Sequence, residues 1–116
     1  MKEITPKQLE AKVFCLKGWV ALTQKKSLFS FFQKQLEIAD FTILNFTDQN
    51  FPNGGYTAMW LLAESHLAIH SFAESGWTYL ELTSCNQPKS EIFKTNILKS
   101  KFKINLDKKH LEISEV

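Results

Sequence analysis

The sequence predicts an α+β fold: a two-layer sandwich in which two helices cover one face of an antiparallel sheet of four or slightly more strands. Three observations predict it. Segments rich in β-forming residues outnumber helical ones, several follow one another through short turns, and both helical segments have an apolar side. The 116 residues, 44% of them hydrophobic, are expected to form one domain over 1–116, with the element order β-α-β-β-β-α-β.

The chain is expected to begin with a strand and a helix. Leu9–Val20 is rich in β-branched and aromatic residues, which favour a strand. Thr23 is a candidate N-cap for a helix that extends to about Asp40. The apolar residues at helical spacing in this segment are Leu28, Phe32, Leu36 and Ala39.

The middle of the chain is expected to supply the consecutive strands. Phe41–Phe46 is predicted to be the second strand, and the composition of Asp48–Gly55 is typical of a loop. Tyr56–Leu62 and Leu67–Phe72 are apolar runs, and Trp77–Thr83 alternates apolar with polar or aromatic residues.

The last part of the chain is expected to form a second helix and a terminal strand. Pro88 suits the start of a helix, and Glu91 is expected in its first turn, with Phe93 and Ile97 on the buried side. The terminal strand is predicted at Phe102–Leu106, with Leu111–Ile113 as a further candidate. One face of the sheet would then lack a cover, and a second copy of the chain is the simplest one, so a homodimer is expected.

The charges are unevenly distributed. All fourteen basic residues are lysines, and none of them lies between Gln35 and Pro88, where six carboxylates lie. An acidic middle favours a cationic small molecule as ligand. Without arginine the lysine-rich ends are expected to form solvated faces and not a nucleic-acid site. A nucleic-acid-binding domain is therefore a third hypothesis that depends on the terminal lysines alone.

No apolar run approaches the ~20 residues that a membrane span requires, and Met1–Pro6 is not followed by the apolar segment of a secretory signal. We therefore expect a cytoplasmic protein without a membrane partner, in which Cys15 and Cys85 are free thiols.

The segment most informative about function is Glu64-Ser65-His66-Leu67-Ala68-Ile69-His70, with Cys85 twenty positions after the serine. It places a carboxylate, a hydroxyl, two imidazoles and a thiol close together. A metal site is disfavoured because the segment is predicted to be a strand and no third ligand has suitable spacing. A serine hydrolase is disfavoured because no Gly-x-Ser-x-Gly elbow is present.

The segment from about Phe51 to Cys85 resembles the prokaryotic short-chain S-adenosylmethionine decarboxylases, which are pyruvoyl-dependent. The Glu-Ser-His-Leu-x-Ile-His core of that family is present in full, followed by Phe72, Glu74 and Cys85. The resemblance implies a proenzyme that cleaves itself between Glu64 and Ser65 into 1–64 and 65–116. Ser65 would become the pyruvoyl cofactor, a carbonyl that accepts the electrons of the lost carboxylate.

The resemblance also implies a role for each matching residue. The substrate would be S-adenosylmethionine, and the product would be the aminopropyl donor for spermidine synthesis. His70 would be the processing base, and Thr57 would assist processing with its hydroxyl. Cys85 would protonate the substrate carbon after carbon dioxide leaves. Phe51 would stack on the adenine beside the sulfonium, and Glu74 would hydrogen-bond the ribose.

Four departures from the family pattern support a second hypothesis. Ala73 replaces a proline, Ser75 an aromatic residue and Asn86 a glycine, and Leu9–Val13 matches the family's N-terminal strand only loosely. The alternative is a non-catalytic, unprocessed homologue that serves as a ligand-binding or interaction module.

The spacing of Ser65 and His70 carries a geometric difficulty. Residues five apart on a straight strand point to opposite faces, whereas His66 and His70 share a face. Direct contact between Ser65 and His70 therefore requires a bulge or bend at Glu64–His66, or a serine that lies outside the strand.

Overall fold

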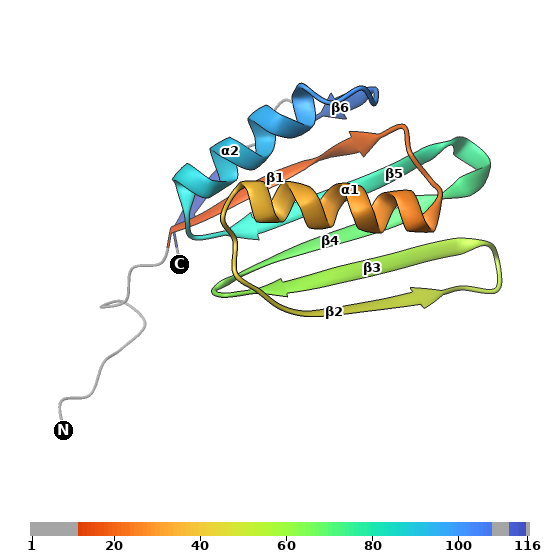
Figure 1. Cartoon of the computed structure of the whole chain (residues 1–116), viewed down its shortest axis with the longest axis horizontal. Helices are drawn as coiled ribbons and strands as arrows, with labels where there is room; N and C mark the ends of the chain where they lie inside the picture. The colour runs from red at the N-terminus through yellow and green to blue at the C-terminus, as the bar shows by residue number, and fades with distance from the viewer. Residues whose placement is uncertain (1–11, 108–111, 116) are drawn as a thin grey trace, which may run out of the picture.

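The computed structural model describes residues 12–107 and 112–115, and it has the predicted two-layer α+β architecture (Figure 1). Both helices lie on one face of a seven-stranded antiparallel sheet, in the order β2-β3-β4-β5-β1-β6, with β7 also paired to β1. The elements are β1 (Lys12–Val20), α1 (Lys25–Ile38), β2 (Ile43–Asn50), β3 (Gly55–Leu62), β4 (Ser65–Phe72), the short 3₁₀ turn η2 (Ala73–Ser75), β5 (Trp77–Ser84), α2 (Gln87–Leu98), β6 (Ile104–Leu106) and β7 (Glu112–Glu115).

Four strands lie between the two helices, so the predicted order, with three strands there, was wrong by one strand. The sheet is also larger than four strands. The apolar runs on either side of Glu64 are separate strands, β3 and β4, joined by the two-residue turn Ala63–Glu64. Because this turn contains neither glycine nor proline, the sequence gives little sign of it.

Helix α1 was predicted with its N-cap at Thr23, and this detail was wrong. The N-cap is Gln24, whose side chain makes no capping hydrogen bond to the backbone. Its Oε1 instead accepts a hydrogen bond from Ser27 Oγ at 2.7 Å. The predicted apolar positions are buried, as expected for the inner side of an amphipathic helix. Of the predicted first strand, residues 9–11 lie outside the described residues.

Strand β2 begins and ends later than predicted. It runs over Ile43–Asn50 and pairs with β3 up to Asn50, which lies opposite Tyr56. The segment predicted as loop, Asp48–Gly55, is therefore a strand in its first three residues and in its last residue. Pairing with β3 outweighs the polar composition here, because the backbone hydrogen bonds of an edge strand do not require apolar side chains.

Helix α2 begins at an asparagine cap. Asn86 Oδ1 accepts a hydrogen bond from the backbone N–H of Lys89 at 3.0 Å. Glu91 consequently lies beyond the first turn, so its predicted place there was wrong. Phe93 and Ile97 are fully buried, as predicted. The predicted terminal strands correspond to β6 and β7, although Leu111 lies outside the described residues.

The two faces of the sheet differ in their cover. On the helix side Trp60 packs against Phe32 of α1, which in turn contacts Phe93 of α2, with ring centroids 6.2 and 6.4 Å apart. Side chains alternate along each strand, so the residues between them point to the other face, which no helix of the described residues covers (Figure 1). Three large apolar side chains are exposed there, namely Met59 (41%), Leu61 (49%) and Phe72 (50%).

Candidate functional site

The candidate residues of β4 lie at opposite ends of this strand. Ser65 is its first residue, and His70 lies five residues later. Because β4 pairs regularly with β3 and β5 throughout, the five-residue rise separates the two Cα atoms by ~16 Å. Ser65 is buried, as are Leu67 and Ile69 on the helix side, whereas His66 and His70 lie on the open face. The bulge that direct contact requires is not formed, so the two groups do not meet within one chain.

The Ser65 hydroxyl is held by a neighbouring serine. Ser65 lies opposite Ser84 on β5 and is only 8% exposed. Its Oγ donates a hydrogen bond to Ser84 Oγ at 2.7 Å, and Ser84 Oγ also accepts from the backbone N–H of Asn86 at 2.9 Å. Sequence reasoning missed this partner, because cross-strand register cannot be derived from one strand alone.

The peptide before Ser65 lies in a strained turn beside a thiol. Glu64 has φ +60°, an uncommon conformation for a residue other than glycine, with a cost of about 1 kcal/mol. The Cys85 thiol lies beside the same residue, with Sγ 3.7 Å from the carbonyl oxygen of Glu64 and 4.0 Å from its Oε2. A weak donor therefore faces the carbonyl that a Ser65 nucleophile would attack.

A cavity of about 390 Å³ opens beside this turn. His66 shares the cavity with Ser65, Glu64 and Cys85, and it lies on the same face as His70, as the strand periodicity predicts. The remaining lining residues are Val13, Leu61, Leu62, Thr83 and Ser84.

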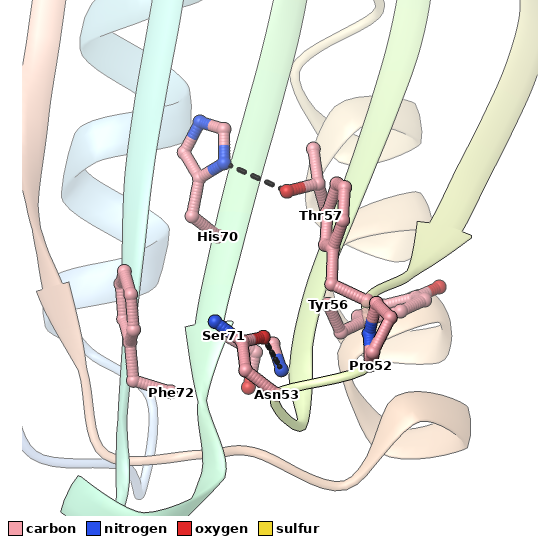
Figure 2. Close-up of a pocket in the computed structure, with 9 residues that line it drawn as sticks. Pro52, Asn53, Tyr56, Thr57, His70, Ser71 and Phe72 are labelled. Carbon is pink, nitrogen blue, oxygen red and sulfur yellow. Dashed lines mark hydrogen bonds between the residues drawn. The ribbon is translucent and has the colours of Figure 1, made fainter.

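At the other end of β4, His70 is paired with a hydroxyl. Thr57 lies opposite His70 on β3, and its Oγ1 is 3.0 Å from His70 Nδ1. Figure 2 shows the two side chains pointing toward one another from adjacent strands, beside Phe72 and the turn that contains Pro52. This hydrogen bond fixes the orientation of the imidazole ring.

The Thr57–His70 pair lines a second cavity, of about 490 Å³. Phe51, 47% exposed in the β2–β3 turn, and Phe72 supply aromatic walls. Glu74, in η2, lines a smaller cavity of about 160 Å³, which shares Asn53, Gly55 and Phe72 with the larger one. The structure therefore brings Thr57, His70, Phe51 and Glu74 to one end of the sheet.

Residues 12–107 and 112–115 contain neither a metal-binding cluster nor a membrane-spanning helix. No group of three or more His, Cys, Asp or Glu side chains there has the arrangement of a metal site. No helix in this part of the chain combines the length and apolar character that crossing a bilayer requires.

Comparison with known sequences identifies a family. A family model described as S-adenosylmethionine decarboxylase matches residues 19–113. An S-adenosylmethionine decarboxylase proenzyme of Parasynechococcus marenigrum (strain WH8102) is 41% identical over 44 residues, which are 38% of this chain and 34% of that protein. A proenzyme of the same name from Pyrobaculum islandicum is 31% identical over 65 residues, 55% of this chain and 52% of that protein. The chain thus matches about a third to a half of the length of these relatives.

Comparison with solved structures supports the same fold. The crystal structure of the adenosylmethionine decarboxylase from Aquifex aeolicus VF5 superposes with a TM-score of 0.58. The superposition covers 84% of this chain and 88% of that chain, at 15% sequence identity. At this identity the likeness concerns the fold, with its open sheet face and one-sided helix layer.

Proposed function

The chain belongs to the S-adenosylmethionine decarboxylase family, and on that premise we propose that it is a proenzyme that cleaves itself before Ser65 and then decarboxylates S-adenosylmethionine. The product would be the aminopropyl donor for spermidine synthesis. The observation that carries the proposal is the placement of the Cys85 thiol 3.7 Å from the carbonyl oxygen of Glu64, the group that cleavage must activate.

Cleavage begins with the serine hydroxyl. Ser65 Oγ, released from Ser84 by rotation about χ1, would attack the carbonyl carbon of Glu64 and convert the amide into an ester. The negative oxygen formed in that step lies within reach of the Cys85 thiol, and the strain at Glu64 is relieved when the peptide bond breaks. Removal of the Ser65 α-proton then eliminates the ester, and hydrolysis of the new end releases ammonia.

The surroundings of Ser65 suit the pyruvoyl group that this sequence of steps would leave. That group supplies a carbonyl that binds the substrate amine and draws electrons from the bond to the departing carboxylate. Cys85 is exposed on the wall of the adjoining cavity, so its thiol is available to protonate the substrate carbon. Phe51 and Glu74, which lie at the His70 end, would bind the adenine and ribose from a second chain, and the aromatic ring would favour the sulfonium by ~0.5–2 kcal/mol.

The site requires a second chain, because His70 lies ~16 Å from Ser65 along β4. The open face exposes Met59, Leu61 and Phe72, which is typical of a surface that packs against a partner. Two copies stacked through this face about a two-fold axis, with their β4 strands running in opposite directions, would place the His70 end of each over the Ser65 end of the other. We therefore propose a homodimer with two composite sites.

The mass of the purified protein tests this function. We expect two fragments, 1–64 and 65–116, the second lacking the serine nitrogen and reacting with a carbonyl reagent such as a hydroxylamine. Ser65→Ala is the control, and it should remain a single 13.4 kDa chain with the same circular dichroism. A wild-type chain that stays intact and unlabelled would instead support the alternative, a non-catalytic homologue; calorimetry with S-adenosylmethionine would then show whether that homologue binds it.

A further inference from the structure

His66 is the imidazole nearest in sequence to the cleavage point, and the cleavage steps above give it no role. We propose, as an extension of the proposed function, that His66 is a proton relay that reprotonates Cys85 after each turnover. It would act through the thiol and not on the substrate, as a positioning residue of the Ser65 end.

The strand register places His66 near the thiol. His66 lies directly opposite Thr83 on β5, and Cys85 follows two residues later. Cys85 comes directly after Ser84, the last residue of β5, and its Sγ lies 3.7 Å from the carbonyl oxygen of Glu64, two residues before His66. Both side chains line the same cavity of about 390 Å³.

The imidazole is free to exchange protons. It is partly exposed, and among the described residues it makes no hydrogen bond. Its direct neighbours across β3 and β5 are Leu61 and Thr83, which do not titrate. The titratable groups of the same chain that face it are Glu64 and Cys85 on the cavity wall, Glu81 one diagonal step along β5, and Cys15 beyond Thr83 on β1. In the proposed dimer, His70 of the partner subunit would lie over this end as well.

Decarboxylation with Cys85 as proton donor would leave the thiol without its proton. Once carbon dioxide has left, the S–H bond of Cys85 breaks and its proton goes to the substrate carbon, which leaves a thiolate. The thiolate must regain a proton before the next turnover. An imidazolium N–H of His66 would donate this proton to Cys85 Sγ, and water would then reprotonate the imidazole.

The first experiment does not depend on cleavage or turnover. In the full-length Ser65→Ala chain, we would measure the iodoacetamide alkylation rate of Cys85 between pH 5.5 and 8.5, using peptide masses to separate it from Cys15. A protonated His66 stabilises the neighbouring thiolate, so the rate relative to Ser65→Ala/His66→Gln should rise roughly threefold as the pH falls through the range in which histidines titrate. Ser65→Ala/Lys99→Gln, which loses a positive charge at the exposed end of α2, should show no such rise. A ratio independent of pH would overturn the relay.

The second experiment uses the mature enzyme. His66→Gln should be cleaved to the wild-type extent, with kcat at least about tenfold lower and KM within about twofold, because only proton return is slowed. Added imidazole should restore kcat in proportion to its protonated form, an effect that a purely structural role would not produce. An unchanged kcat, or a loss that imidazole does not restore in a chain with wild-type circular dichroism, would refute the relay. Failure of the wild-type chain to cleave would instead refute the proposed function, while the alkylation ratio would still report the His66–Cys85 coupling.

Discussion

The two ends of β4 carry different chemical groups. At the Ser65 end, a buried hydroxyl, a carbonyl in a strained turn and an exposed thiol lie beside one cavity. At the His70 end, an imidazole oriented by Thr57 lies beside aromatic walls and near a carboxylate, but the Glu64–Ser65 peptide bond lies at the other end of the strand. Each end holds groups that the other lacks.

This difference indicates how the fold is used. A regular strand keeps residues five apart on opposite faces and ~16 Å from each other, so a straight β4 cannot bring Ser65 to His70. The open face offers the same surface to a second copy. In a two-fold symmetric contact, each contact between a residue of one chain and a residue of the other occurs twice. On this interpretation β4 spans both composite sites of the dimer.

Mixing two inactive variants tests most directly whether Ser65 and His70 of one site come from different chains. Ser65→Ala and His70→Ala chains should each fail to cleave alone. After they are mixed at equal amounts and allowed to exchange subunits, about half of the His70→Ala chains should be cleaved, because random pairing gives half of them a partner with an intact His70. Intact mass identifies which chain has been cut.

The control for that experiment is the double variant Ser65→Ala/His70→Ala mixed with the His70→Ala chain. Neither chain then supplies an imidazole at position 70, so no cleavage should follow. Complete absence of cleavage in the first mixture, with subunit exchange verified by native mass spectrometry, would contradict the two-chain site.

A charge placed on the open face should separate the two subunits of the dimer. Met59, 41% exposed, lies on β3 opposite Ala68 and would be buried in the dimer. Met59→Glu should abolish dimerisation, because burying an unpaired carboxylate costs several kcal/mol. Light scattering would then report the single 13.4 kDa mass, and self-cleavage should slow sharply. Ile92→Glu, at a similar exposure of 43% on α2, should remain dimeric; equal behaviour of the two variants would argue against this interface.

The two ends also differ in how far the sequence predicted them. The motif around Ser65 correctly indicated the family, and alternation along β4 correctly indicated that Ser65 and His70 point to opposite faces. What the sequence did not supply was the register between strands, which determines that Ser65 meets Ser84 and Thr57 meets His70. Register depends on turn geometry and packing across the sheet, and the Ala63–Glu64 turn has no glycine or proline to mark it.

The predicted boundary between the second strand and the following loop was wrong for a related reason. Asp48–Asn50 has the composition of a loop, yet it is a strand because β3 supplies its hydrogen-bond partners. The polar side chains of this edge strand are largely exposed, so composition and backbone pairing point in opposite directions there. By contrast, the buried stripes of both helices followed from their spacing alone, since 3.6-residue periodicity is a local property.

Removing the hydroxyl that orients His70 should have a smaller effect. Thr57→Val keeps the shape of the side chain but loses the 3.0 Å contact with His70 Nδ1. We expect cleavage to slow roughly fivefold, the kinetic equivalent of about 1 kcal/mol for one hydrogen bond. Thr57→Ser, which retains the hydroxyl, should cleave at nearly the wild-type rate. If valine and serine behave alike in a time course of intact mass, Thr57 does not position the imidazole.

The smallest effect concerns the scaffold of the His70 end. Tyr56 ties β3 to β2, because its hydroxyl donates a hydrogen bond to Asp48 Oδ2 at 2.7 Å. Burial, this bond and the Asp48 charge raise the pKa of Tyr56 well above its usual range. A raised pKa in the folded state means that the stabilisation is complete below the unfolded pKa of about 10 and is lost as the pH rises toward the folded pKa.

The free energy of unfolding in urea should therefore fall above about pH 10. Tyr56→Phe should cost about 1 kcal/mol at pH 7 and flatten that fall, leaving the part due to Tyr79, whose pKa burial also raises. A fall of the same steepness in Tyr56→Phe would show that the Tyr56–Asp48 bond does not hold β2 against β3 in solution.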